Sequence, residues 1–210
     1  MNISIINGSP KSGKNTSEIL INFFLSELGG KHSVETYRPS KQPVSSEQLE
    51  RLRESDVILF VFPLYVDSIP SHLLELLVKI SNQIKLYSKT VVYCLVNNGF
   101  FEGIQNHIAI EQMQLWCASV GATWGQAIGL GAGEMLPFIA DIPLGHGPNK
   151  NLGRAMKELV HNVQNKTGGD CMYISPNWPR PLWKLQSSLF VWYPRAKQNG
   201  LKIRELSAPR

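Results

Sequence analysis

The sequence has few cysteines, and their arrangement excludes several kinds of site. Only Cys94, Cys117 and Cys171 are present among 210 residues. They are widely spaced, odd in number and without a Cys-x-x-Cys pair, which argues against a disulfide framework, an iron–sulfur cluster or a zinc site. The five histidines also lie far apart without ligand spacing. We therefore expect no metal site.

Long apolar runs are missing as well. No uninterrupted stretch approaches the roughly 20 apolar residues that span a bilayer. The chain begins without the basic segment and apolar run of a signal peptide. Its hydrophobic content of 43% is that of a soluble globular protein. We therefore expect a cytoplasmic protein with one sizeable core and an appendage.

The main part of the chain has no excess of charge. Residues 1–166 hold 14 Lys and Arg against 14 Asp and Glu, whereas residues 167–210 hold seven against two. The net charge of +5 therefore resides in the second segment. Nucleic acid binding is not expected of the main domain.

Apolar runs alternate with helical patterns through residues 1–166. Continuous β-branched and aromatic runs such as residues 56–62 are typical of strands buried on both faces, as parallel sheets require. The expected strands lie near residues 2–7, 32–38, 56–62, 90–96 and 122–130, and the expected helices near 16–28, 46–54, 70–80, 104–120 and 151–165. Five strands alternating with five helices predict an α/β domain with a doubly wound parallel sheet of order 2-1-3-4-5. The remaining residues, 167–210, are predicted to form a C-terminal extension.

The turn after the first strand is rich in small, polar and basic residues. It leads into a helix that Thr16 or Ser17 can cap, so the unpaired N–H groups and positive dipole end of that helix face the turn. Such a turn is suited to a phosphate. The candidate ligands are Ser9, Ser12, Thr16 and Ser17, reinforced by Lys11 and Lys14.

The same turn nearly matches a nucleoside-triphosphate loop. Gly8 is followed after four residues by Gly13 and Lys14, but Asn15 stands where a Ser or Thr should hold magnesium. A phosphotransferase that binds ATP with magnesium is therefore an alternative hypothesis. An ordinary turn without a ligand is the structural alternative.

Three loops are expected at one place in this fold. In a sheet of order 2-1-3-4-5, ligands bind beyond the carboxyl ends of the strands, between the first and the third. Residues 8–17, 63–70 and 97–103 would meet there.

These three loops resemble those of the flavodoxin-like NAD(P)H-dependent FMN reductases and quinone reductases. The resemblance covers about residues 1–166. It rests on Gly8-Ser9-Pro10 with Asn15-Thr16, on Pro63-Leu64-Tyr65 with Ile69-Pro70, and on Asn98-Gly99-Phe100. It implies a flavodoxin-like fold, FMN as cofactor and NAD(P)H as co-substrate.

The resemblance also assigns roles to individual residues. The first loop would hold the FMN phosphate, through Ser9, Lys11, Asn15, Thr16 and Ser17. The other loops would hold the flavin ring, with Pro63, Leu64, Tyr65 and Val66 lining it and Asn97, Asn98 and Gly99 on its pyrimidine side. Phe100 and Phe101 depart from the family pattern toward bulkier side chains.

The resulting hypothesis is an oxidoreductase that passes hydride from NAD(P)H through FMN to a small acceptor such as a quinone or free flavin. No protein nucleophile is required, because the cofactor carries out the redox chemistry. A homodimer is expected. Besides the phosphotransferase, two further alternatives remain: a flavodoxin-like electron carrier, against which the uncharged domain argues, and a partner-binding protein that has lost the cofactor.

A glycine-rich segment, Gly129 to Gly133, follows the fifth strand. It does not continue as the helix that a dinucleotide-binding fingerprint needs. It is interpreted as a flexible loop at the rim of the site.

The C-terminal extension differs in composition from the rest. It contains Trp178, Trp183 and Trp192, and Leu182, Leu185, Leu189 and Trp192 recur at helical spacing. We expect a helix that packs on its own domain or on a dimer partner. Contact with an anionic membrane surface is the alternative.

Overall fold

The structure, a computed structural model, describes residues 1–207 except residues 12, 14, 31, 85, 87 and 88. The chain divides into two compact units, Met1–Pro176 and Asn177–Arg210. None of the helices formed by the described residues has the length and apolar composition that crossing a bilayer requires. These residues also contain no group of three or more His, Cys, Asp or Glu side chains suited to a metal ion.

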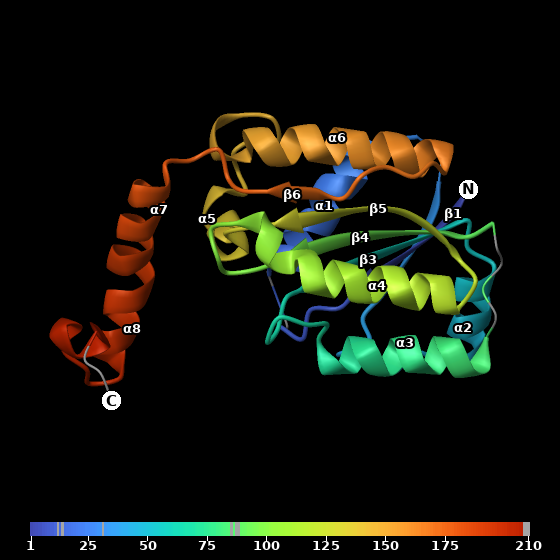
Figure 1. Cartoon of the computed structure of the whole chain (residues 1–210), viewed down its shortest axis with the longest axis horizontal. Coiled ribbons are helices and arrows are strands. Elements are labelled where there is room, and N and C mark those ends of the chain that lie inside the picture. Colours follow the sequence, from blue (N-terminus) through green and yellow to red (C-terminus); the bar gives the residue numbers. More distant parts are fainter. Residues whose placement is uncertain (12, 14, 31, 85, 87–88, 208–210) are drawn as a thin grey trace. The chain divides into compact units, whose positions relative to one another are not determined.

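The first unit is built on one parallel sheet with strand order β2-β1-β3-β4-β5-β6 (Figure 1). The strands are β1 (Asn2–Asn7), β2 (Ser33–Tyr37), β3 (Val57–Pro63), β4 (Val91–Asn97), β5 (Thr123–Leu130) and β6 (Met172–Ile174). The parallel sheet and the order of its first five strands are as predicted. The prediction of only five strands is wrong, because three-residue β6 pairs in parallel with the end of β5. The division between the units accordingly lies at residue 176 rather than at the expected 166.

Helices connect the strands and cover both faces of the sheet (Figure 1). They are α1 (Thr16–Leu28), α2 (Ser46–Arg53), α3 (Ser71–Gln83), α4 (His107–Ser119), α5 (Leu136–Ile139) and α6 (Lys150–Asn165). Ser45 caps α2, and Gln48 bonds back to the Ser45 N–H in a capping box. The segment between β5 and α6, predicted to be a loop, contains the short helix α5.

Alternate residues of the buried strands point to opposite faces of the sheet. On one face Ile5, Leu59 and Leu95 pack with the apolar sides of α1 and α6. On the other face Phe60 and Cys94 pack with α2, α3 and α4. The sheet is thus buried on both sides, which is why its strands are continuously apolar.

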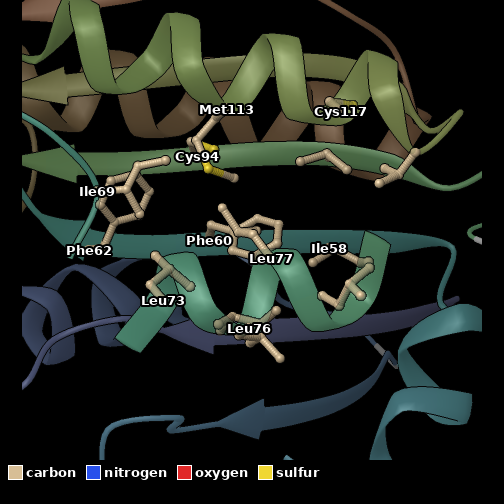
Figure 2. Close-up of a cluster of buried hydrophobic side chains, with 14 of the residues drawn as sticks. Ile58, Phe60, Phe62, Ile69, Leu73, Leu76, Leu77, Cys94, Met113 and Cys117 are labelled. Carbon is tan, nitrogen blue, oxygen red and sulfur yellow. The ribbon is translucent and has the colours of Figure 1, made fainter. Parts of the chain in front are cut away.

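Phe60 occupies the centre of the second cluster. Figure 2 shows it with Phe62 of the same strand and Leu77 of α3. Its ring meets the edge of the Trp116 ring on α4, with centroids 5.4 Å apart and planes at 82°. This packing links β3 to α4 and fixes the helices on that face.

Residues 167–176 contribute hydrogen bonds to the sheet. Two chains truncated before and after this segment should therefore differ in their free energies of unfolding. A chain ending at Lys166 loses the Ile174 carbonyl, which accepts the Gly131 N–H at 2.9 Å, and the Asp170 carbonyl, which accepts Gln126 Nε2 at 2.9 Å. A buried polar group left unpaired costs about 1–3 kcal/mol. We expect the chain ending at Lys166 to be at least about 2 kcal/mol less stable to urea than a chain ending at Pro176. Equal stabilities would show that β6 does not contribute to the sheet.

Candidate functional site

The carboxyl ends of β1, β3 and β4 bring the three predicted loops together. The Gly8 N–H donates to the Val61 carbonyl at 2.8 Å, joining the first loop to β3. The Leu64 N–H donates to the Asn97 carbonyl at 2.7 Å, joining the second loop to the end of β4. The buried Asn97 amide donates to the Phe62 carbonyl at 3.1 Å and more weakly to the Ser17 hydroxyl at 3.4 Å. The three loops are therefore fixed to one another by hydrogen bonds between neighbouring strand ends.

Gly8 allows the first loop to lie close to the sheet. A Cβ atom at this position would come within 2.7 Å of Leu73 Cδ2 and 2.9 Å of Phe62 Cβ, closer than real Cβ atoms approach their neighbours. The Gly8 carbonyl also lies 2.9 Å from His72 Nε2 on α3. Any side chain here would push the loop away from β3 and α3.

Asn15 caps α1, a role that the sequence analysis gave to Thr16 or Ser17. Its Oδ1 accepts the Glu18 N–H at 3.1 Å, and its Nδ2 donates to the carbonyls of Gly13 and Lys11 at 2.9 and 3.2 Å. The side chain is therefore used to shape the loop and start the helix. It also takes the place at which a nucleoside-triphosphate loop needs a hydroxyl for magnesium, so the phosphotransferase alternative gains no support.

The first turn of α1 presents donors that no described residue satisfies. The N–H groups of Thr16 and Ser17 have no acceptor among the described residues, whereas the next N–H is capped by Asn15. Unpaired first-turn N–H groups and the positive end of the helix dipole together favour an anion. The Thr16 hydroxyl is engaged elsewhere, since it donates to the Gly133 carbonyl at 2.8 Å.

The other residues predicted for the first loop have different surroundings. Ser9 is buried, and its N–H donates to Asn7 Oδ1 at 3.0 Å. Lys11 is exposed, so its ammonium group can reach an anion at the surface of the loop. Ser12 and Lys14 lie outside the described residues.

A bidentate ion pair supports the base of this loop. Arg38 donates to both carboxylate oxygens of Glu18, at 2.6 and 2.8 Å, and Asn7 Nδ2 donates to Glu18 Oε2 at 3.0 Å. These hydrogen bonds, chiefly the one from Arg38, hold the pKa of Glu18 below its usual value. The pair neutralises a carboxylate that would otherwise oppose an anion at the start of α1.

The second loop ends in a tight turn with an exposed apolar tip. Tyr65 and Ser68 exchange two backbone hydrogen bonds of 3.0 Å, and the residues between them, Val66 and Asp67, have φ values of 49° and 54°. Left-handed backbone is costly for a β-branched residue such as Val66, whose side chain is 98% exposed. Such outliers are concentrated at ligand-binding positions. Pro63 and Leu64, which precede the turn, are only partly exposed.

The third loop combines a buried amide with an exposed ring. Asn98 Nδ2 donates to the Glu102 carbonyl at 3.2 Å, while the buried Asn98 Oδ1 has no hydrogen-bond partner among the described residues. Gly99 is exposed, and the Phe100 side chain is 54% exposed. This loop therefore places an exposed backbone and an exposed apolar ring above a buried, unpaired acceptor.

A fourth segment, which the sequence analysis placed only at the rim, contacts both the third loop and α1. Gly133 donates its N–H to the Asn98 carbonyl at 2.7 Å and accepts from Thr16, while Ala132 donates its N–H to Phe100. A Cβ atom at Gly131 would lie 2.1 Å from the Phe101 carbonyl oxygen. The run of glycines was the available signal, because it marks a backbone that must approach another backbone closely.

Comparisons with known proteins agree on the fold. Residues 1–91 match the model of a family described as having a flavodoxin-like fold. No curated protein sequence matched the chain. The flavodoxin-like architecture inferred from the sequence is thus confirmed.

Solved structures of oxidoreductases share this fold. An azoreductase from Bacillus anthracis str. Sterne has a TM-score of 0.56 at 15% identity, covering 79% of this chain and 99% of its own. An FMN-dependent NADH-azoreductase from Bacillus anthracis str. Ames Ancestor, solved in complex with FMN, has a TM-score of 0.57 at 13% identity, covering 78% and 99%. An NAD(P)H:quinone oxidoreductase from Methanothermobacter marburgensis has a TM-score of 0.56 at 15% identity, covering 78% and 97%.

The strained turn predicts a stabilising substitution. Replacing Val66 by Gly removes the steric cost of left-handed backbone, which is about 1–2 kcal/mol for a residue with a Cβ atom. The free energy of unfolding should rise by about 1 kcal/mol in urea titrations. Asp67→Gly is the matched control and should gain less, because Asp tolerates this conformation better. A lower free energy of unfolding for Val66→Gly than for the unsubstituted protein would show that the backbone at Val66 is not strained.

The Glu18 ion pair predicts a dependence of stability on pH. Because the folded pKa of Glu18 lies below its unfolded value, the pair stabilises the protein above the unfolded pKa of about 4.3 and loses this effect as the pH falls through the folded pKa. Arg38→Gln should therefore lower the free energy of unfolding at pH 7 by about 1 kcal/mol, a modest value because the pair is partly exposed. The difference from the unsubstituted protein should shrink below pH 4.

Arg51→Gln, which breaks two more exposed pairs, with Glu47 and Glu35, serves as the control for this experiment. It should leave the free energy of unfolding at pH 7 nearly unchanged, because fully exposed ion pairs contribute little to stability. An effect of Arg38→Gln that does not vary with pH would show that Glu18 titrates normally.

Proposed function

We propose that this protein is an FMN-dependent oxidoreductase that transfers reducing equivalents from NAD(P)H to a small acceptor such as a quinone or free flavin. The observation that carries the proposal is the first turn of α1, where no described residue accepts the N–H groups of Thr16 and Ser17, at the switch point between the adjacent strands β1 and β3. It lies at the sheet edge shared with the second and third loops, where ligands bind in doubly wound folds.

The donors of the first loop suit the phosphate of FMN. The N–H groups of Thr16 and Ser17 would donate hydrogen bonds to the phosphate oxygens at the positive dipole end of α1, and Lys11 would add a positive charge from the surface. Asn15 would act indirectly, by holding the loop that surrounds the phosphate. Ser9 contributes its buried backbone to the same loop.

The other two loops suit a flat, partly apolar ring. Tyr65 and Phe100 are exposed apolar side chains on the second and third loops. The exposed backbone of Gly99 would offer hydrogen-bonding groups to the pyrimidine edge of the ring, and the buried Asn98 side chain would support this backbone from beneath through its bond to the Glu102 carbonyl. Bound FMN would supply the two-electron chemistry, taking up hydride from NAD(P)H and delivering two electrons to the acceptor.

The structural neighbours support this assignment by analogy. They include an FMN-dependent NADH-azoreductase and an NAD(P)H:quinone oxidoreductase, which share the fold at 13% and 15% identity. Fold alone does not establish function. The proposal therefore depends on the fit of the three loops.

Absorption spectra test the proposal directly. The purified protein, mixed with FMN and passed through a desalting column, should retain the flavin absorption bands. Anaerobic addition of NADH or NADPH should then reduce the bound FMN and bleach these bands. Retention of FMN without bleaching would favour an electron carrier, and failure to retain FMN would overturn both readings.

A substitution at Lys11 tests whether the first loop binds the phosphate. Reversing a charge near a phosphate in water changes the interaction by roughly 1–2 kcal/mol, so Lys11→Glu should weaken FMN binding on the order of tenfold. Riboflavin, which lacks the phosphate, should bind both proteins with equal affinity. Fluorescence titration measures both affinities.

Lys157→Glu, on the exposed side of α6, is the matched control and should leave FMN affinity unchanged. Equal losses of FMN affinity in the two variants would indicate a general charge effect. Equal losses for FMN and riboflavin in Lys11→Glu would place the phosphate elsewhere.

A further inference from the structure

The second unit, described through residue 207, contains one nearly continuous helical stretch. It comprises α7 (Arg180–Ser187), a π-helical turn, η4 (Ser188–Trp192), and α8 (Tyr193–Gln198). Pro194 lies in the first turn of α8, so its missing N–H and bulky ring meet the wider π-helical turn instead of breaking the helix. The helix therefore continues past Pro194 to Gln198.

This unit has almost no core of its own. Among its described residues only Ala196 is buried. Many of its large apolar side chains are exposed, with Phe190 at 72% and Trp192 at 56%, while Trp178, Trp183 and Tyr193 are half-buried. The exposed set is Leu182, Leu185, Leu189, Phe190, Trp192, Leu201, Ile203 and Leu206. Segments shorter than about 40 residues rarely bury enough surface to be stable alone, so this apolar surface requires a partner.

The charges of the unit indicate what that partner is. Residues 177–210 contain seven Lys and Arg and one acidic residue, Glu205, giving +6, whereas residues 1–176 contain 14 against 15, giving −1. No described residue forms an ion pair with Lys184, Arg195, Lys197, Lys202 or Arg204. Two copies of this unit would repel each other, and the first unit offers no opposite excess of charge. An anionic surface is complementary.

The arrangement of side chains favours a lipid surface. Leu182, Leu185 and Leu189 recur at helical spacing, while Lys184 and Arg195 lie away from this stripe. The Arg195 guanidinium lies 6.0 Å from the centre of the Trp192 ring, which places a cation beside an amphipathic aromatic side chain. A stripe of exposed leucines, accompanied by Trp and by Lys and Arg, is typical of helices that lie in the plane of a bilayer interface.

We propose that residues 177–207 bind the surface of an anionic phospholipid bilayer, with the stripe Leu182, Leu185, Leu189 inserted among the acyl chains and the cations at the headgroups. From the sequence we expected this helix to pack on its own domain or on a dimer partner. The first unit carries a net charge of only −1, and the second units of two copies would repel each other. An anionic lipid surface therefore complements the charge of this segment better than either of them. The proposal does not depend on the proposed redox function.

Vesicle sedimentation with the full-length protein tests the proposal. The protein should sediment with vesicles that mix phosphatidylcholine and phosphatidylglycerol and should remain in solution with phosphatidylcholine alone. Each Lys or Arg near the surface contributes about fivefold in affinity, so Lys184→Gln should weaken binding about fivefold. Added salt should weaken it further, because surface charges are screened over about 10 Å at 0.1 M.

Leu185→Glu places a carboxylate in the apolar stripe and should abolish sedimentation with the mixed vesicles. Leu115→Glu is its matched control, since Leu115 on α4 is an exposed leucine of the first unit, at 72%, and should leave binding unchanged. Leu185→Gln, a milder change, should weaken binding if Leu185→Glu fails to fold. Equal binding to both kinds of vesicle, or binding insensitive to Leu185, would overturn the proposal.

Two further measurements identify the other possible occupants. If Leu185→Glu converts a dimer to a monomer in sedimentation velocity and no protein sediments with vesicles, the stripe is an interface between copies. If it lowers the thermal midpoint of the first unit without vesicle binding, the stripe packs on its own domain. Either result overturns the membrane proposal and leaves the flavin test unaffected.

Discussion

The pairing of β1 with β2 on one side and β3 on the other is the interaction on which the candidate site depends. Because the chain leaves β1 in one direction and returns to β3 on the opposite side, α1 and α3 cover opposite faces of the sheet. The loops that lead into these helices therefore turn toward opposite faces of the sheet at the carboxyl ends of their strands. The first turn of α1 lies at this switch point, with N–H groups that no described residue accepts.

Around this switch point, backbone rather than large side chains forms the close contacts between segments. Gly8 lies against β3 and α3, and Gly131 and Gly133 lie against the third loop, each at a distance that a Cβ atom would not permit. Hydrogen bonds from Leu64 and Asn97 then fix the second and third loops in register. The result is a set of rigid strand ends that carry a strained, exposed turn at Val66 and an exposed ring at Phe100. A rigid base with exposed apolar edges is suited to a flat ligand, because little ordering is left to be done on binding.

The two units differ in how far they bury their own apolar side chains. The first unit buries both faces of a parallel sheet, and most of its charges balance. The second unit exposes its apolar side chains and carries an uncompensated positive charge. The second unit therefore requires a partner surface to cover its apolar side chains, whereas the first unit has a hydrophobic core of its own.

The amino-acid sequence by itself determined the parallel sheet, its first five strands and the three loops, since these follow from apolar runs, glycines and helix signals that act locally. Only the tertiary structure decided three other points. Met172–Ile174 became a strand because the end of β5 offered an unpaired edge, which no three-residue pattern can indicate. Asn15, rather than Thr16 or Ser17, became the cap, because its amide could also bond the Gly13 carbonyl while Thr16 reached the Gly133 carbonyl. The segment around Gly133 joined the site through a hydrogen bond from Thr16, 117 positions away, and a contact of that kind is set by the topology of the sheet rather than by local sequence.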